Sequence, residues 1–557
     1  MKKRKIGILS LAVVMGLSVF ATACGSKSSG DGAKKKSITA TMNSTFDGKF
    51  NPALYDSVYD AYILDQTFAS LWKQDEKLET SIPDLAESWK ESEKKDGVSI
   101  KLRQNAKWSD GKPITVDDVI FTWKFIANKE YSGSRFEYVE SIKGAKEYRE
   151  GKAQDIEGIK KVDDYNLEVT FEKSDARDLS TKVFSTPMPK HIFENKPVKT
   201  LENDPAVKKA ENIVTSGPFT IKEIKAGEFV VLEKNKNFYG AAEGKPKLDQ
   251  IVWKVLQEDV AIGALKEGKV DMVSRIKPGS FETIKGFKDV ELVEDTDLGY
   301  QYLGFRTDHP KLTDKRVRRA IAYAINREQM VTGLLKGHGT LLSTPVSPKS
   351  WAYSKDLDAE YSYDPAKAKE LLAEAGYKDT NGDGFVEDPS GKPYVLSLEF
   401  PKGNQVREQS AKLIREDLEK AGIKIDLKQP KDFAALAEVV QQKADKTMEM
   451  WLMGWTTDVD PNPKNIYGST AESNYYRWKS PESDKSIGVS MYDQKAFTKE
   501  GRKALIKDWT KIFQQDSPVV LLYSQNIIDA YNKRMTGVQY DYRGALGHPS
   551  FVDWDVK

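Results

Sequence analysis

The sequence predicts a mixed α/β protein of several lobes. Strand and helix patterns alternate along the whole chain, and hydrophobic residues make up 39% of its 557 residues. Together with glycine, that fraction reaches the content typical of globular proteins. At ~150 residues per domain, this length corresponds to roughly three or four domains. The chain is therefore expected to bury a large core, and a disordered or fibrous protein is excluded.

The predicted strands are short segments with a period of two. Residues 38–42 and 167–171 alternate between apolar and polar side chains, which is typical of strands with one buried face. The run at 229–232 is rich in β-branched and aromatic residues and is followed by turn-forming residues. We expect a strand at each of these three places.

Three helices are predicted in the second half of the chain. Thr313 is expected to cap a helix whose apolar face extends to Val331. A second helix is expected to begin at Pro365, a residue that suits the first helical position, and to end before a glycine. A third helix over about 406–421 is expected to lead into an alternating strand at 423–427.

Charge and cysteine content exclude several classes of protein. Lys plus Arg number 86 and Asp plus Glu number 84, so the formal net charge is only +2. The basic excess of nucleic-acid-binding proteins is missing. One cysteine excludes a disulfide framework, a structural zinc site and an iron–sulfur cluster, and four scattered histidines do not predict a metal site. The usual local motifs of serine hydrolases, zinc proteases and P-loop proteins are also missing.

The amino terminus has the pattern of a secretory signal. Basic residues 2–5 precede an apolar run at 6–23, which ends in small residues before Cys24. This end resembles the lipobox of bacterial lipoproteins, whose cysteine is acylated and becomes the first residue of the mature chain. The alternatives are an uncleaved membrane helix and a plain secreted protein. Residues 24–36 are rich in Gly, Ser and Lys and predict a flexible tether.

One segment has the spacing of a calcium-binding loop. Asp379, Asn381 and Asp383 stand at alternate positions before Gly384, and Glu387 or Asp388 can reach back as a further ligand. Oxygen ligands at such a spacing converge on a hard cation, and the glycine allows the sharp turn. The alternative is a metal-free turn that joins a helix to a strand.

A second acidic segment has the residue types of a glycosidase. Asp458 and Asp460 stand close together beside tryptophan and proline residues. Two carboxylates are the usual acid and base of glycoside hydrolysis. A solvated loop is the alternative interpretation.

Longer sequence motifs lie between residues 82 and 328, within a resemblance that runs from about Ile38 to Asp553. They are Ile82-Pro83-Asp84-Leu85-Ala86-Glu87-Ser88-Trp89, Leu102-Arg103-Gln104-Asn105-Ala106-Lys107-Trp108-Ser109-Asp110-Gly111-Lys112-Pro113, Asp117-Asp118-Val119-Ile120-Phe121, Ser216-Gly217-Pro218-Phe219, Ala264-Leu265-Lys266-Glu267-Gly268-Lys269-Val270-Asp271 and Arg319-Ala320-Ile321-Ala322-Tyr323-Ala324-Ile325-Asn326-Arg327-Glu328. Together these motifs resemble the dipeptide and oligopeptide family of extracytoplasmic solute-binding proteins that serve ABC importers.

The resemblance implies a two-lobed periplasmic-binding-protein-like α/β fold in its large, three-domain form, with a hinge and a ligand cleft between the lobes. The expected parts are a signal peptide at 1–23, a tether at 24–36, lobe I in segments 37–75, 184–302 and 525–557, an inserted smaller domain at 76–183, and lobe II at 303–524.

The resemblance also implies a peptide site. Gly454-Trp455-Thr456-Thr457-Asp458 matches the Gly-Trp-x-x-Asp pattern of the family, in which the acid pairs with the α-amino group of a peptide. Such a pair is reasonable because an ammonium removed from water needs a charged hydrogen-bonding partner. The backbone of Gly454, Trp455 and Thr456 is expected to pair with the extended peptide like a strand added to a sheet edge. Asp56, Ser57 and Val58 are expected to line the peptide from the other lobe.

The expected function is that of a binding protein and not of an enzyme. Held by a lipid anchor at Cys24 on the outer face of the cytoplasmic membrane, it is expected to capture peptides and to deliver them to the permease subunits of an ABC transporter. We expect a monomer with no required cofactor and no nucleic-acid partner; a structural calcium ion is the one cofactor considered. The alternatives are another solute, such as an oligosaccharide or a nickel chelate, or an extracellular glycosidase or peptidase.

Overall fold

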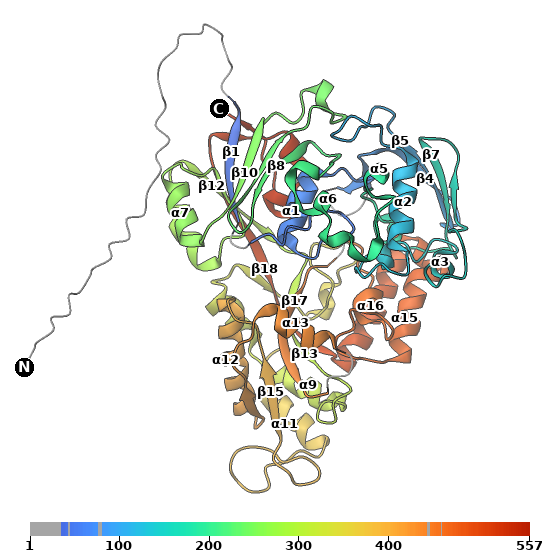
Figure 1. The fold of residues 1–557 in the computed structure, drawn as a ribbon. Coiled ribbons are helices and arrows are strands. Elements are labelled where there is room, and N and C mark those ends of the chain that lie inside the picture. The colour runs from blue at the N-terminus through green and yellow to red at the C-terminus, as the bar shows by residue number, and fades with distance from the viewer. Residues whose placement is uncertain (1–34, 43–44, 76–80, 443–445, 458) are drawn as a thin grey trace, which may run out of the picture. The chain divides into compact units, whose positions relative to one another are not determined.

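The largest sheet of the protein is organised around one long strand, β18 (Val519–Asn532). The computed structural model describes residues 35–42, 45–75, 81–442, 446–457 and 459–557, and within them this sheet contains twelve strands. The first part of β18 pairs with β13 (Tyr300–Phe305), and its last part pairs with β12 (Val290–Thr296). Figure 1 shows β18 passing from the strands labelled β1, β8 and β10 to those labelled β13 and β17. β18 therefore belongs to both groups of strands.

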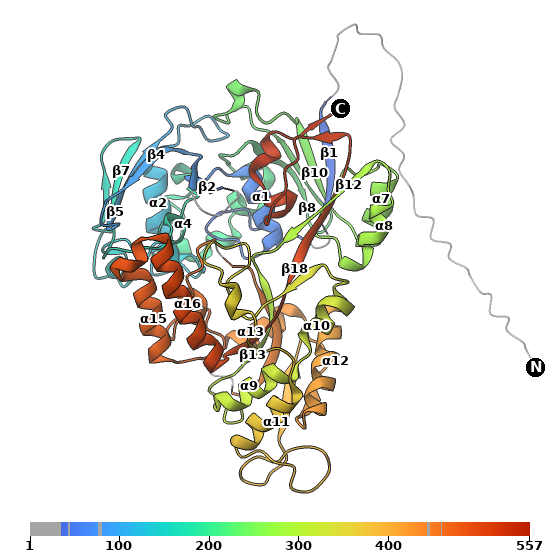
Figure 2. The ribbon, with the colours of Figure 1, turned by 180° about the vertical axis from the view of Figure 1, so that it is seen from behind.

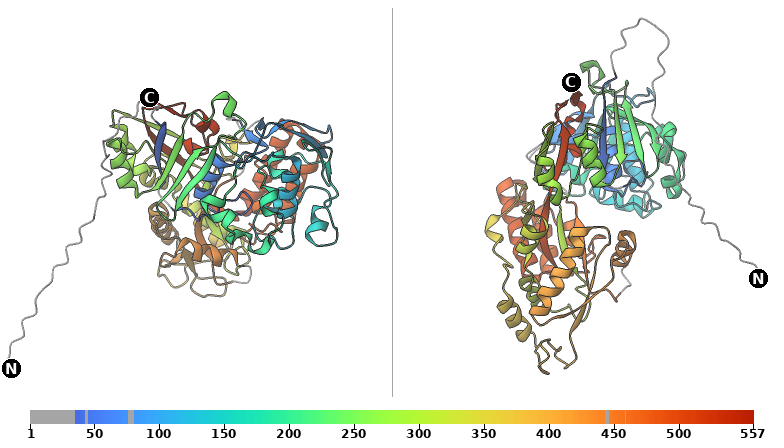
Figure 3. Two further views of the ribbon diagram at one scale, coloured as in Figure 1. Left: turned by 45° about the horizontal axis from the view of Figure 1, so that its top comes forward. Right: turned by 90° about the vertical axis from the view of Figure 1, so that its left-hand side faces the viewer.

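The remaining strands of this sheet flank β18 on its two sides. On one side of β13 lie β17 (Met450–Trp455), β15 (Val395–Glu399) and β16 (Lys424–Leu427). Beyond β18, on the other side, lie β11 (Met272–Val273), β1 (Ser37–Met42), β10 (Gln250–Val255), β9 (Phe229–Lys234) and β8 (Phe219–Lys225). β14 (Gly339–Leu341) pairs with β18. In Figure 3 the blue strand β1 lies beside the green strands of this group. The strands predicted at 38–42, 229–232 and 423–427 are thereby confirmed.

Smaller sheets and helices complete the chain. A four-stranded sheet contains β4 (Ala86–Glu91), β5 (Gly97–Leu102), β7 (Asn166–Thr170) and β6 (Ile159–Lys161), and two-stranded sheets pair β2 (Trp72–Gln74) with β3 (Ser81–Pro83) and β19 (Met535–Thr536) with β20 (Asp555–Val556). The helices are α1 (Val58–Thr67), α2 (Val116–Ile126), α3 (Ala145–Arg149), α4 (Leu179–Lys182), α5 (Lys190–Phe193), α6 (Pro205–Lys208), α7 (Glu258–Lys266), α8 (Phe281–Lys285), α9 (Lys315–Ala324), α10 (Arg327–Gln329), α11 (Pro365–Glu374), α12 (Gln405–Lys420), α13 (Phe433–Gln441), α14 (Lys464–Tyr467), α15 (Pro481–Tyr492), α16 (Lys499–Asp516) and α17 (Gly544–Gly547). The strand predicted at 167–171 is confirmed as β7.

Both faces of β13 and β17 are buried. Leu303 and Leu452 lie in a core shared with α9, α11 and α12. Tyr302 and Trp451 point to a second core, shared with α13, α15 and α16; α15 and α16 lie side by side in Figure 2. Successive side chains of a strand alternate between its faces, so a strand buried on both faces consists of apolar residues throughout. This accounts for the unbroken apolar character of β17.

Two of the predicted helices are confirmed, and each ends at a glycine. α11 begins at Pro365, and its last turn is followed by Gly376 with φ +91. α12 is followed by Gly422 with φ +93. Residues with a β-carbon rarely adopt this left-handed conformation, so glycine stops each helix at that point.

The helix predicted after Thr313 is shorter than expected and has a different cap. The side chain of Asp314 caps α9, whereas the hydroxyl of Thr313 bonds to a carbonyl of the preceding loop. α9 ends at Ala324, and Asn326 caps the next helix, α10. The predicted continuous face to Val331 is wrong, because Val331 belongs to a separate π-helical turn. That turn packs into the same core as α9, which explains the similar apolar spacing.

The other hydrophobic cores combine distant parts of the chain. One core contains Ile38, Trp253 and Trp554, and another contains side chains from positions between 53 and 207. The predicted domain boundaries stay a prediction; those at 302/303 and 524/525 fall inside β13 and β18. No helix in the described part of the chain combines the length and the apolar character needed to cross a membrane.

Candidate functional site

The amino-terminal end of α1 carries the first predicted site segment. The hydroxyl of Ser57 accepts a hydrogen bond from the backbone N–H of Tyr59 at 3.2 Å, so Ser57 caps the helix. Asp56 forms an ion pair with Lys49, whose Nζ lies 2.9 Å from its Oδ2. Val58 is 40% exposed although it is apolar. The cap therefore sets where α1 begins, with Asp56 and Val58 on either side of that point.

The second predicted segment ends β17. The indole N–H of Trp455 donates to the hydroxyl of Tyr476 at 2.7 Å, which holds the ring in place. At Gly454 a β-carbon would lie 2.6 Å from the side chain of Gln301 and 3.0 Å from that of Arg407. These two side chains are joined by a hydrogen bond of 2.7 Å from Arg407 Nε to Gln301 Oε1. Glycine at 454 therefore leaves the space that this pair occupies.

One edge of β17 lacks a strand partner over its last residues. Residues 450–455 pair with β13 along their whole length. On the other side, β15 pairs only with residues 450 and 451. Within the described parts of the chain, no strand pairs with residues 452–455 on that side. Backbone groups at such an edge can pair with an added strand.

Two adjoining cavities bring these segments together. A cavity of about 550 Å³ is lined by Asp56 together with Trp455 and Thr456. A cavity of about 430 Å³ is lined by Val58 and again by Thr456. Four of the predicted peptide-binding residues therefore line a shared space. Ser57 and Gly454 line neither cavity. The contacts predicted for them, including backbone pairing at Gly454, stay predictions.

Two predicted functional residues, Asp458 and Cys24, lie outside the described residues. The neighbours of Asp458 are described, and Thr457 and Val459 both line the smaller cavity. The roles of Asp458 and Cys24 stay predictions.

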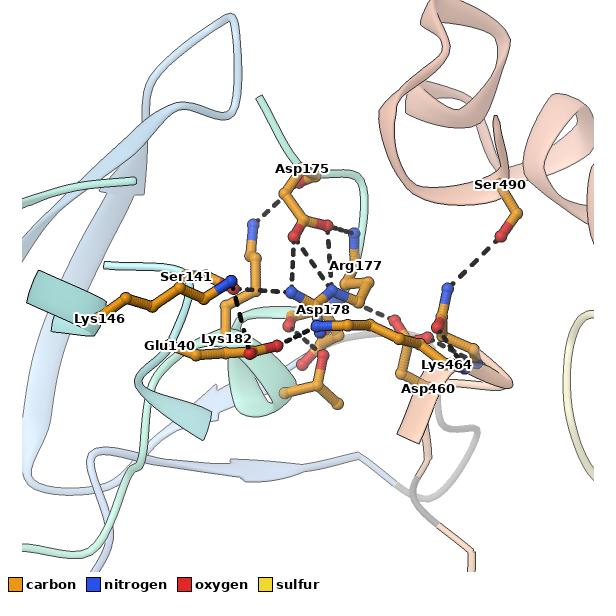
Figure 4. A network of polar contacts seen from close by, with 12 residues as sticks. Glu140, Ser141, Lys146, Asp175, Arg177, Asp178, Lys182, Asp460, Lys464 and Ser490 are labelled. Atoms are coloured by element: carbon orange, nitrogen blue, oxygen red, sulfur yellow. Dashed lines mark hydrogen bonds and ion pairs between the residues drawn. The ribbon is translucent and has the colours of Figure 1, made fainter. Parts of the chain in front are cut away.

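Asp460 lies in a buried network of charged groups (Figure 4). Its carboxylate accepts hydrogen bonds from Nη1 and Nη2 of Arg502 at 2.8 and 2.6 Å and from the backbone N–H of Asp178 at 2.7 Å. Burial opposes ionisation, but the charge and hydrogen bonds of Arg502 outweigh it and lower the pKa of Asp460. A glycosidase acid needs a raised pKa and a proton to donate. This environment does not suit the acid of a glycosidase pair, and the bidentate contact with Arg502 suits a structural role.

The same network connects two regions that are distant in sequence. Lys464 forms an ion pair with Glu140, and the backbone N–H of Ala176 donates to the carbonyl of Met491 at 2.8 Å. Figure 4 shows Lys464 and Asp460 facing residues 140–182. These contacts hold the chain around 140–182 against the chain around 460–502.

The predicted calcium loop folds as a network of turns. The carboxylate of Asp379 accepts backbone N–H bonds from Gly382 and Gly384 at 2.7 and 3.0 Å. Glu387 accepts the backbone N–H and the hydroxyl of Thr380 at 2.7 and 2.6 Å, and Asn381 donates to its other oxygen. In the described residues, no group of three or more His, Cys, Asp or Glu side chains is arranged to hold a metal ion. Calcium at Asp379, Asn381, Asp383 and Glu387 stays a prediction, and internal hydrogen bonds already order this loop.

Asp65 is a cavity residue that the sequence analysis missed. It lies on α1 and lines both cavities. Its side chain is solvent-accessible where it lines these cavities. Burial raises the pKa of Asp65 to about 6, although the nearby positive charges of Lys73 and Arg543 oppose that rise. In the sequence, nothing distinguishes this residue from the many other acids on helices.

A family model for bacterial extracellular solute-binding proteins, family 5, matches residues 80–477 of this chain. The chain belongs to this family. Its members are binding proteins that act outside the cell, and the two-lobed periplasmic-binding-protein fold predicted for this chain is confirmed. The resemblance identified from the sequence motifs is confirmed as well.

Individual relatives match over nearly the whole chain. The oligopeptide-binding protein AppA of Bacillus subtilis is 33% identical over 557 residues, which covers 97% of each chain. The structure of Bacillus subtilis AppA in complex with a nonapeptide matches with a TM-score of 0.80 at 28% identity, covering 94% of this chain and 99% of that one. Lactococcal OppA, complexed with an endogenous peptide in the closed conformation, matches with a TM-score of 0.84 at 20% identity and covers 94% of this chain and 100% of its own.

Asp460→Ala is expected to destabilise the protein strongly. Removing this carboxylate leaves the buried charge of Arg502 unpaired, which typically costs about 3–5 kcal/mol. Chemical or thermal denaturation followed by circular dichroism measures the loss. The matched control is Asp426→Ala, because Asp426 pairs with Lys428 at the surface; the expected loss there is below about 1 kcal/mol. Equal losses in the two variants would contradict the structural role of Asp460.

Asp65→Asn is expected to stabilise the protein at neutral pH. Because the pKa of Asp65 is raised from 3.8 to about 6, the folded state carries an unfavourable carboxylate above about pH 6, and this cost disappears as the pH falls toward 4. Allowing for water in the cavities, we expect the melting temperature to rise by roughly 1–3 °C at pH 7.5 and to stay unchanged at pH 4. Thermal melts of both proteins across this pH range measure the effect. A lower melting temperature at pH 7.5 would show that Asp65 stabilises the fold.

Proposed function

We propose that this chain captures peptides in the cavities beside Thr456 and delivers them to an ABC importer. The observation that carries this proposal is the meeting of α1 and β17, which places Asp56, Trp455 and Thr456 around one cavity of about 550 Å³. The unpaired edge of β17 adds backbone groups that suit an extended chain. The relatives support the same class of ligand, since the Bacillus subtilis protein is named for oligopeptides and its structure contains a nonapeptide.

Recognition through the main chain explains how one site accepts many sequences. Hydrogen bonds between the edge of β17 and a peptide backbone do not depend on the side chains of the peptide. The adjoining cavities of about 550 and 430 Å³ leave room for side chains and for bridging water. We propose that closure of the lobes around the peptide bends the shared strands β13 and β18, a hinge motion driven by contacts that only the closed form makes.

The peptide amino terminus is assigned to Asp458. Its sequence neighbours Thr457 and Val459 both line the smaller cavity, which supports this assignment. A carboxylate there would replace the hydration that the ammonium loses on binding.

Asp458→Ala is expected to weaken peptide binding at least tenfold, since removing one partner of a buried charge pair costs about 2–5 kcal/mol. N-acetylation of the peptide is expected to weaken binding to the wild type by a similar factor and to have little further effect on Asp458→Ala. Isothermal titration calorimetry of both proteins with both peptides measures these affinities, and Asp426→Ala is the control.

The same titrations also test the proposed function. Mass spectrometry after binding is expected to recover the peptide intact, and the bound protein is expected to melt at a higher temperature. Hydrolysis of the peptide would support the enzyme alternative. Equal affinities for free and acetylated peptides would refute the role of Asp458 while leaving peptide binding in place.

The membrane attachment is proposed to depend on Cys24. Acyl chains on this cysteine would anchor the protein, and the tether at 24–36 would let it reach its permease as a monomer. Cys24→Ala is expected to release the protein from the membrane into the soluble fraction. Fractionation followed by immunoblotting, with palmitate labelling of the wild type, measures this. Membrane retention of Cys24→Ala without label would instead support an uncleaved helix.

A further inference from the structure

Asp65 stands where the two cavities meet. The larger and the smaller cavity share Asp65, Phe68, Ser70, Ser180 and Thr456 as lining residues. Val58, Ala61, Tyr62 and Asp65 all line the smaller cavity, and their spacing places them on one face of α1. Asp65 is therefore presented toward the same space as Thr456, at the end of the edge strand assigned to the peptide.

Among the residues that the structure describes, the carboxylate of Asp65 forms neither a hydrogen bond nor an ion pair. The other charged residues that line the smaller cavity each contact an opposite charge. These pairs are Lys73 with Asp84 at 3.5 Å, Arg275 with Asp297 at 3.6 Å, and Arg543 with Asp541. Each of these three cations therefore has an acid partner of its own. Lys73 and Arg543 still act on Asp65 through their charge, but neither forms an ion pair with its carboxylate.

The surroundings of Asp65 suit a long side chain with a charged end. Apolar groups of Val58, Phe68, Leu298 and Phe551 line the smaller cavity around it. Lysine and arginine carry apolar stems that pack on such surfaces and a cation that needs an acceptor. An ion pair formed away from bulk water gains more than one at the surface, provided that both charges find their partner. A neutral side chain in the same place would leave the carboxylate unpaired.

We propose that Asp65 binds the cationic side chain of a lysine or arginine residue of the bound peptide, so that this protein selects basic peptides over neutral ones. The proposal rests on the proposed function, because it assigns a side-chain preference to the same peptide site. It also gives a reason for the exposed carboxylate: its partner arrives with the ligand.

The test compares matched nonapeptides in calorimetric titrations. Each pair carries lysine or its neutral analogue Nε-acetyl-lysine at one position, and the position is moved along an otherwise uncharged sequence with a free amino terminus. At one or more positions, the wild type is expected to bind the lysine peptide at least about tenfold more tightly than its analogue. In Asp65→Asn this ratio is expected to fall below about twofold, and Asp65→Glu is expected to retain part of it. Asp426→Asn, which changes a surface acid, is the control and should keep the wild-type ratio.

The outcomes separate the proposal from the function on which it rests. If the wild type binds the peptides without any lysine preference, or if Asp65→Asn keeps the preference, peptide capture stands and the role of Asp65 is wrong. If Asp65→Asn instead removes the penalty for N-acetylation, Asp65 binds the peptide amino terminus and the side-chain proposal is wrong. If no peptide of the series binds the wild type, the proposed function fails, and this inference fails with it. Circular dichroism melts confirm that each variant is folded before titration.

Discussion

The arrangement of the site depends on one uninterrupted strand. β18 pairs with β13 and β14 through its first residues and with β12 and β11 through its last residues. Asp529 on β18 adds a second constraint, because its buried carboxylate accepts hydrogen bonds from Ser274, from the backbone of Arg275 and from the backbone of Ala545 at 2.7, 2.8 and 2.8 Å. Arg275 in turn lines the smaller cavity. The cavity wall and the strands that end beside it are therefore held by the same element, and any bending of β18 would move them relative to one another.

Structural and binding acids differ in whether donors of the protein satisfy their carboxylates. Asp460 is almost completely buried, and two guanidinium nitrogens and one backbone N–H satisfy its carboxylate. Asp529 is equally buried and is satisfied by three donors from two segments. Such acids hold the fold together, since an isolated buried charge would be costly. Asp65 differs because it lines both cavities and no donor among the described residues reaches its carboxylate. A carboxylate that destabilises the free protein has a physical explanation when a ligand supplies its missing cationic partner.

The polar network around Asp460 also limits how the site can open. Contacts of Asp460 with Asp178, of Lys464 with Glu140, and between the backbones of Ala176 and Met491 join regions that lie on different predicted domains. The proposed hinge motion would have to leave these contacts intact or replace them with hydrogen bonds to water. A buried charge that loses its partner is costly in free energy. The network therefore favours a few discrete arrangements of the two regions over a continuous range.

The sequence by itself determined the local elements and the family. Alternation of apolar residues identified β1, β7 and β16, glycine identified the ends of α11 and α12, and the combined motifs identified a solute-binding protein. These features depend on neighbouring residues, so they can be read from the chain directly. Local reasoning failed at the start of α9, where Thr313 and the adjacent Asp314 can both cap a helix and Asp314 is the residue that does so.

Only the tertiary structure decided which side chains share a cavity and which acids are paired. Asp56 meets Trp455 although they are far apart in the chain, Asp460 finds Arg502, and Asp65 finds no donor in the described protein. The strength of a charge interaction depends on distance and on exclusion of water, and neither is encoded in the spacing of residues along the chain.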